Sequence, residues 1–152
     1  ELAYQTAKLI ARMHGHRVII VNPAHKFGLE NARYNPMVII LDDLEFAPQD
    51  AMADCWSLAL QLLPPAPGGD RDPFWPNGTR KLLVFVIIAL CVLRGSREAN
   101  LPRVFEILGE NDAFERLLSE ELAGELANLA HNIACTWDEN PKHFESFREG
   151  AV

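Results

Sequence analysis

The sequence predicts a mainly α-helical protein, a helical bundle with a short α-β piece attached before it. The main observation is a run of twelve apolar residues, Leu82–Leu93. A helix without a polar face must be buried on most sides. At ~1.5 Å per residue this run spans roughly 18 Å, which is too short to cross a bilayer core of ~30 Å. We therefore expect a central helix that is enclosed by other helices.

The second observation concerns the first 23 residues, which indicate a helix followed by a buried strand. Apolar residues at helical spacing predict an amphipathic helix over Leu2–Met13, and Gly15 suits its end. Residues 18–21 are four consecutive β-branched residues closed by Pro23, a pattern typical of a strand in a parallel sheet. A helix, a short turn and a buried strand form the second half of a βαβ unit. The first strand of that unit would precede Glu1.

The third observation is a series of helix signals with turns between them. Residues 34–36 predict a turn, because Pro36 disfavours the helical conformation at Asn35. Met37–Leu41 reads either as a second short strand or as the start of a helix. A helix is expected over Asp50–Leu63, and the Pro/Gly-rich residues 64–69 end it.

The remaining elements are expected to be helices with recognisable caps. Asp72 and Pro73 suit the start of the central helix, which should end near Gly95. Asn100 is expected to cap a helix closed by Gly109, and one or two helical turns follow around residues 114–118. Ser119 is predicted to cap the next helix, over residues 122–133, and Asn140-Pro141 opens a last helix.

Composition sets broad limits on function. A length of 152 residues suits one domain, and a formal net charge of −7 argues against a protein that coats nucleic acid over its whole surface. Three scattered cysteines in apolar surroundings predict buried thiols in a reducing compartment. The chain begins with Glu1 inside an apparent helix, so we expect it to be a fragment of a longer protein.

An ordered series of short motifs resembles the coupling proteins of type IV secretion and conjugation, the TraG-like ATPases. The motifs extend over nearly the whole chain, and their order is more specific than any one of them. They are Glu1-Leu2, Gly15-His16-Arg17, Asn22-Pro23, Tyr34-Asn35-Pro36, Asp72-Pro73-Phe74-Trp75, Lys81-Leu82-Leu83 and Leu101-Pro102-Arg103-Val104.

The resemblance implies two parts. Residues 1–46 would be a segment of a P-loop nucleotide-binding domain, and residues 47–152 the all-α domain inserted into it. It also implies that the parent is a homo-hexameric ATPase on the cytoplasmic face of the bacterial inner membrane, anchored by segments outside this chain and working with other secretion components. The all-α domain would help to select cargo, either secreted proteins or a relaxase bound to DNA.

The chain itself is not expected to be an enzyme. A phosphate loop needs Gly-x-x-x-x-Gly-Lys-Ser/Thr, and the sequence has no such spacing, so ATP and Mg²⁺ are expected only in the parent. Residues 38–43 imitate a Walker B strand that leads to Asp42 and Asp43, although without a phosphate loop they also fit an acidic helix start. His14 and His16 lack the spacing of a zinc site. No catalytic or metal-binding residue is therefore predicted.

Uneven charge gives the clearest prediction of a binding surface. Residues 106–139 hold nine acids, and Arg116 is the only Lys or Arg among them. Such an acidic lobe would attract basic peptides and repel phosphate, although it could equally serve only solubility. The candidates for contact with basic cargo are Glu120, Glu121, Glu125, Asp138 and Glu139.

The alternative is a contact with single-stranded DNA. Arg94, Arg97 and Arg103 follow the central helix and could bind phosphates, although they also fit helix termination and ordinary surface charge. A third possibility is a fragment of an unrelated P-loop enzyme in which the region of Asp42 is catalytic.

Overall fold

The computed structural model describes residues 34–152 together with Thr6 and Met13. Asn35–Val152 forms one compact unit, in which the structure has seven α-helices and no strand. The prediction of a mainly α protein is confirmed. The buried strand at residues 18–21 lies outside the described residues, as does the helix predicted for residues 2–13 apart from Thr6 and Met13, which are both helical. The α-β piece therefore stays a prediction.

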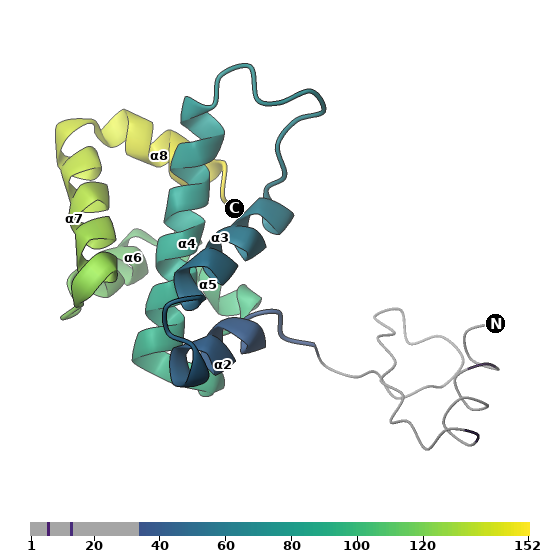
Figure 1. Ribbon diagram of the computed structural model, residues 1–152. Helices are drawn as coiled ribbons and strands as arrows, with labels where there is room; N and C mark the ends of the chain where they lie inside the picture. Colours follow the sequence, from purple (N-terminus) through teal and green to yellow (C-terminus); the bar gives the residue numbers. More distant parts are fainter. Residues whose placement is uncertain (1–5, 7–12, 14–33) are drawn as a thin grey trace. The chain divides into compact units, whose positions relative to one another are not determined.

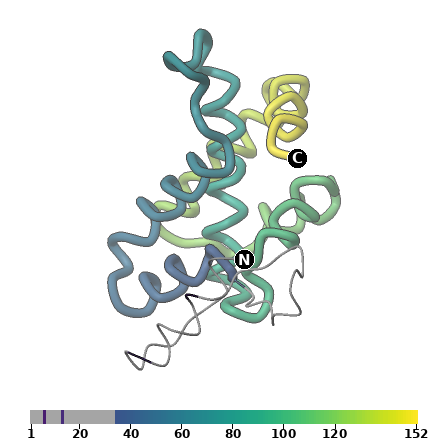
Figure 2. The backbone as a smooth tube through the Cα atoms, turned by 90° about the vertical axis from the view of Figure 1, so that its right-hand side faces the viewer, coloured from purple at the N-terminus to yellow at the C-terminus, as the bar shows by residue number. Residues whose placement is uncertain are grey.

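The central helix of the bundle is α4 (Phe74–Arg94), around which the others pack (Figures 1 and 2). Every residue from Leu82 to Cys91 is buried, with at most 4% of its surface exposed. The sequence predicted this burial, because no side of the segment is polar. The prediction fails at Val92, which is 51% exposed and lies in the last turn of α4. The neighbouring helices cover that turn only on one side.

The other helices pack on two sides of α4 (Figure 1). Helices α2 and α3 pack together and against α4, while α7 and α8 pack together and contact α4 on its other side. Helix α5 contacts α4 and continues into α6. Their bounds are Val38–Phe46 for α2, Ala51–Leu62 for α3, Leu101–Gly109 for α5, Asn111–Leu118 for α6, Gly124–Glu139 for α7 and Pro141–Glu149 for α8; a short 3₁₀ helix covers Gly95–Arg97.

Two helix starts follow the predicted capping chemistry. The Asn100 side chain accepts a hydrogen bond from the backbone N–H of Arg103 at 3.1 Å and opens α5. The Asn140 side chain accepts one from the backbone N–H of His143 at 3.3 Å and opens α8. Each cap satisfies a backbone donor that has no partner inside its helix, and a proline follows in the first turn.

Ser119 does not cap a helix, contrary to the prediction. Its hydroxyl donates to the carbonyl oxygen of Arg116 at 2.9 Å, so it helps to end α6. Helix α7 begins only at Gly124, whose φ of +60° lets the chain turn into the helix. Residues 119–123 therefore form a link between α6 and α7.

The ambiguous segment Met37–Leu41 belongs to α2, so it is not a strand. The Asn35 side chain accepts from the N–H of Met37 at 3.1 Å and donates to the carbonyl of Ala99 at 2.6 Å, which fixes the start of α2 against the bundle. A Walker B site needs a strand that ends in its carboxylate, so this helix does not fit that interpretation of Asp42.

Among the described helices, none has the combined length and hydropathy needed to cross a bilayer.

Candidate functional site

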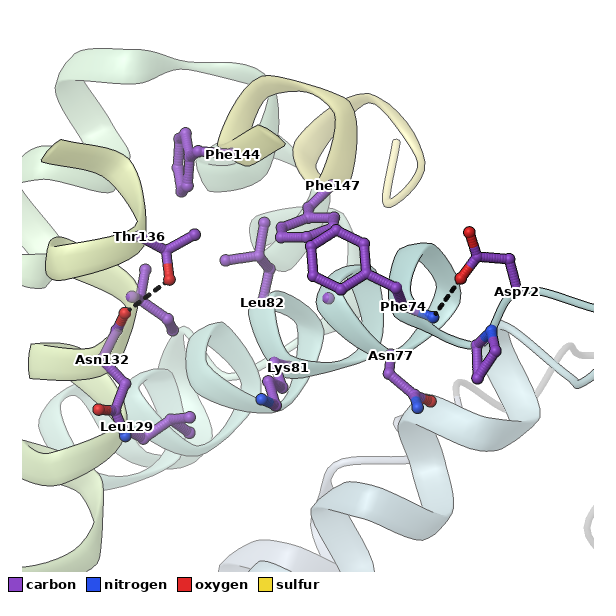
Figure 3. Close-up of a pocket in the computed structure, with 13 residues that line it drawn as sticks. Asp72, Phe74, Asn77, Lys81, Leu82, Leu129, Asn132, Thr136, Phe144 and Phe147 are labelled. Atoms are coloured by element: carbon purple, nitrogen blue, oxygen red, sulfur yellow. Dashed lines mark hydrogen bonds between the residues drawn. The ribbon is translucent and has the colours of Figure 1, made fainter. Parts of the chain in front are cut away.

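A cavity with a volume of about 520 Å³ lies between α4, α7 and α8. Most of its wall is apolar, and a smaller part is polar. Figure 3 shows Phe74 and Phe147 side by side, with Leu82 and Lys81 of α4 between them and the side chains of α7. The apolar lining residues are Pro73, Phe74, Gly78, Leu82, Leu129, Ile133, Phe144 and Phe147, and the polar ones are Asp72, Asn77, Lys81, Asn132 and Thr136.

Close packing of α8 on α4 forms one wall of this cavity. A Cβ atom on Gly78 would lie closer than 3.0 Å to three ring atoms of Phe147, so the missing side chain lets the ring rest on α4. The Phe147 ring is 5.2 Å from that of Phe74 and 5.6 Å from that of Trp75. Asp72 accepts from the N–H of Phe74 at 3.1 Å and fixes the start of the helix that carries these rings.

An aromatic cluster holds the corner between α7 and α8. The rings of Trp137 and Phe144 are stacked, with centroids 4.3 Å apart and an interplanar angle of 6°. Phe114 packs against both, and it also contacts Phe85 of α4 at 5.8 Å. Because Phe144 and Phe114 are almost completely buried, the corner is anchored in the bundle core and fixes the angle at which α7 faces the cavity.

The polar groups of the cavity divide into those with partners and those without. Asn77 accepts from Arg80 at 3.0 Å, and the Thr136 hydroxyl donates to the backbone carbonyl of Asn132 at 2.9 Å (Figure 3). The side chains of Lys81 and Asn132 are exposed and make no hydrogen bond or ion pair with any described residue. These two groups can therefore bind a ligand without first losing a protein partner.

Arg80, adjacent to the cavity, is a buried arginine with 4% of its surface exposed. It donates to the carbonyl of Leu63 at 3.0 Å and to Asp70 and Asn77 at 3.1 and 3.0 Å. A hydrogen bond from the N–H of Ala66, together with Arg80, lowers the pKa of Asp70. Arg80 thus ties the connector after α3 to α4. The only signal in the sequence was an Asp ten residues earlier.

The five acids predicted to bind cargo do not form one lobe. Glu125 is in the first turn of α7, whereas Asp138 and Glu139 are in its last turn. At ~1.5 Å per residue, the two ends of this stretch are about 20 Å apart. Glu120 and Glu121 lie in the link before α7. The acids therefore occupy both ends of one helix, and the cavity lies along its middle.

Two of the three arginines predicted to contact DNA are already paired. Arg94 forms an ion pair with Glu120 at 2.5 Å, and Arg103 forms one with Glu106 at 2.7 Å, which raises the pKa of Arg103. Arg97, at the end of the 3₁₀ helix, is exposed and has no ion-pair partner among the described residues. Two of the three charges are thus partly neutralised before any phosphate approaches.

A second acidic cluster lies where α2 meets α3. Burial, a hydrogen bond with the carboxyl of Asp54 and the charges of Asp54, Asp50 and Asp42 raise the pKa of Asp43. Within the described residues, no group of three or more His, Cys, Asp or Glu side chains is arranged to hold a metal ion. Burial, followed by the neighbouring carboxyl groups, explains the raised pKa of Asp43.

The thiols follow the sequence prediction in two cases of three. Cys55 and Cys91 are buried, and burial raises the pKa of both, that of Cys91 to about 12. Cys135 is half-buried, with its sulfur 3.6 Å from Nε2 of His131 on the preceding turn of α7.

Comparison with known proteins gives one family. The family model for conjugative DNA transfer by the type IV secretory system matches residues 1–144. The match therefore covers the segment before Asn35 and nearly all of the helical unit, including the α7 wall of the cavity. Comparisons with curated proteins and with solved structures give no match.

Proposed function

The chain belongs to the type IV secretory system conjugative DNA transfer family, and from this we propose that its helical unit is the cargo-recognition domain of a coupling ATPase. The sequence placed the start of the all-α domain at residue 47, but α2 packs against α3 and α4 in the same compact unit, so in this proposal the domain begins at Asn35. The residues before Asn35 correspond to a segment of the nucleotide-binding domain. The cargo is a relaxase carrying DNA or a secreted effector protein. The domain binds its cargo and performs no chemistry on it.

The cavity between α4, α7 and α8 is the observation that carries the proposal. Its volume of about 520 Å³ is in the range of sites that enclose most of a small ligand, and its mainly apolar wall suits the side chains of a peptide. Glu125 and Glu139 are exposed on the same helix and unpaired within the described part of the chain. Apolar burial would provide affinity, while exposed acids would attract a basic signal and repel the phosphates of DNA.

The motor functions are assigned to other parts of a longer protein. The sequence has no phosphate loop, so ATP and Mg²⁺ would bind elsewhere in the parent. We propose that the parent is a homo-hexamer at the cytoplasmic face of the inner membrane. The helical unit would then bring cargo to the motor, which works with the other secretion components.

Binding of a labelled cargo signal peptide to the 152-residue chain tests this function. Fluorescence anisotropy should give saturable binding that weakens when Glu121, Glu125 and Glu139 are changed together to Lys. The matched control reverses three exposed acids on other elements: Glu45, Glu98 and Asp112. Equal affinity of both triple variants and the wild type would contradict an acidic binding surface.

The same assay with a single-stranded oligonucleotide tests the alternative of a DNA contact. Affinity for DNA depends steeply on salt when phosphate contacts dominate it. Because Arg94 and Arg103 are paired with acids, we expect no saturable DNA binding at physiological salt. DNA binding that is lost when Arg97 is changed to Glu would favour the alternative.

A further inference from the structure

We propose that the cavity between α4, α7 and α8 selects cargo peptides by the spacing of three residues. These are a bulky apolar residue, a Lys or Arg three positions before it, and another Lys or Arg three positions after it. The apolar side chain enters the cavity, and the two basic side chains contact Glu125 and Glu139. This inference rests on the proposed function and specifies which peptides the domain accepts.

The argument begins with the periodicity of α7. Asn132 lines the cavity, and Glu125 and Glu139 lie seven residues before and after it on the same continuous helix. Seven residues are within about 20° of two full turns, so the three side chains lie in one row along the helix. Each acid is therefore about 10 Å from Asn132 along the axis.

A peptide in the polyproline II conformation matches this distance after three residues. It has three residues per turn and advances ~3.1 Å per residue, so side chains three positions apart point the same way and lie about 9 Å apart. A peptide that lies along α7 with one side chain in the cavity would place the third residue on each side beside Glu125 and Glu139. Neither acid has an ion-pair partner among the described residues, so both are available to a Lys or Arg of the cargo.

The chemistry of the cavity selects the central residue. Phe74 and Phe147 at one side and Leu129 and Ile133 on α7 provide an apolar wall for an aromatic or large aliphatic side chain. Lys81 is the only Lys or Arg in the lining, and its ammonium group is exposed. Lys81 would repel a basic residue placed at the cavity. It therefore disfavours peptides that bring a Lys or Arg, instead of the apolar residue, to this position.

The two unpartnered polar side chains suit the backbone of the cargo. The Asn132 amide can both donate and accept, as a peptide bond does, and the Lys81 ammonium can donate to a carbonyl. Both groups are exposed at the cavity in Figure 3, Asn132 on α7 and Lys81 on α4. A segment of extended cargo between α7 and α4 could therefore have its backbone groups satisfied from either side.

A matched set of three labelled peptides tests the spacing with the 152-residue chain. The first has a central Trp with an Arg three residues to each side. The second has the same composition with each Arg next to the Trp, and the third has Ala in place of Trp. Anisotropy at low salt should give an affinity for the first peptide at least fivefold higher than for either of the others.

Variants of the protein connect this preference to the cavity. Asn132→Trp should fill the cavity and weaken binding of the first peptide at least tenfold, since an apolar anchor is worth that much or more. Asn111→Trp is the control, because this residue is also an exposed Asn but lies at the start of α6 and is not in the lining. Glu125→Lys and Glu139→Lys should each weaken binding about three- to tenfold, while Glu115→Lys on α6 should not.

The outcomes separate this inference from the proposed function. Equal affinity for the two arginine spacings, or equal effects of Asn132→Trp and Asn111→Trp, would overturn the spacing even if a natural cargo signal still binds. Failure of the chain to bind both the designed peptides and the natural signal would overturn the proposed function as well. Circular dichroism of each variant establishes that it is folded before its binding is compared.

Discussion

Replacing Gly78 by Ala tests the contact that forms one wall of the cavity. The added Cβ would lie closer than 3.0 Å to three atoms of the Phe147 ring, whereas ordinary contacts begin at 3.4 Å. The ring would have to retreat by about 1 Å, yet it is buried and packed against the rings of Phe74 and Trp75. We therefore expect Gly78→Ala to push α8 away from α4 or to drive Phe147 into the cavity.

The magnitude follows from two opposing terms. Overpacking of a buried contact costs typically about 1–3 kcal/mol, and Ala in a helix interior is favoured over Gly by about 1 kcal/mol. Because other rings confine Phe147, we place the cost at the upper end, which leaves a net loss of about 1–2 kcal/mol. In a unit of this size that lowers Tm by about 4–8 °C.

Thermal and urea unfolding, followed by circular dichroism, provide the measurement. Gly109→Ala is the control, since Gly109 is a helical glycine, the last residue of α5, with nothing within 4 Å of an added Cβ. The double variant Gly78→Ala with Phe147→Leu should lose less stability than the separate effects predict, because the ring is gone. An unchanged Tm for Gly78→Ala, or an equal cost with and without the Phe147 ring, would refute the reasoning.

Three further predictions concern buried groups. Arg80→Met should cost about 1–3 kcal/mol in urea unfolding and expose the connector at residues 64–73 to proteases, since its partners lose their donor; an unchanged midpoint would contradict this. Asp43→Asn should stabilise the protein at neutral pH, because the raised pKa of Asp43 means that the folded state disfavours its ionised carboxylate. This gain should vanish once the pH falls below 3.8, the ordinary pKa of the carboxyl group, because Asp43 is then protonated in both the folded and the unfolded state. Urea denaturation at neutral pH and below pH 3.8 measures the difference. Of the three thiols, Cys135 should react first with a thiol reagent, whereas Cys55 and Cys91 should react only on unfolding; simultaneous reaction would contradict their burial.

The sequence predicted those elements whose signals are local. The apolar run of α4 dictates burial from Leu82 to Cys91, and the Asn-x-Pro and Asn-Pro starts of α5 and α8 carry their own caps. Ser119 carries the same kind of signal, but a serine also ends helices by bonding to a carbonyl of the preceding turn. Local pattern alone could not choose between these two roles, because the choice depends on where the next helix packs.

Neither the cavity nor the hydrogen bonds of Arg80 could be predicted from the sequence, because both depend on contacts between distant parts of the chain. Arg80 bonds to Leu63 and Asp70 across a turn rich in Pro and Gly, and the cavity forms only when α8 returns to Gly78. The same limit applies to the predicted acidic surface. The sequence shows how many acids there are, but only the bounds of α7 show that Glu125 and Glu139 lie at opposite ends of one helix.

The position of Glu139 at the end of α7 predicts that this acid lowers the stability of the helix. The last turn of a helix carries a partial negative charge, so a carboxylate there is unfavourable by about 0.3–1 kcal/mol, whereas Glu125 in the first turn is favourable by a similar amount. Glu139→Gln should therefore raise stability and weaken binding of a basic peptide, while Glu125→Gln should lower both. Urea unfolding and anisotropy on the same two variants measure these effects. If both substitutions shift stability in the same direction, the helix charge is not what distinguishes the two ends of α7.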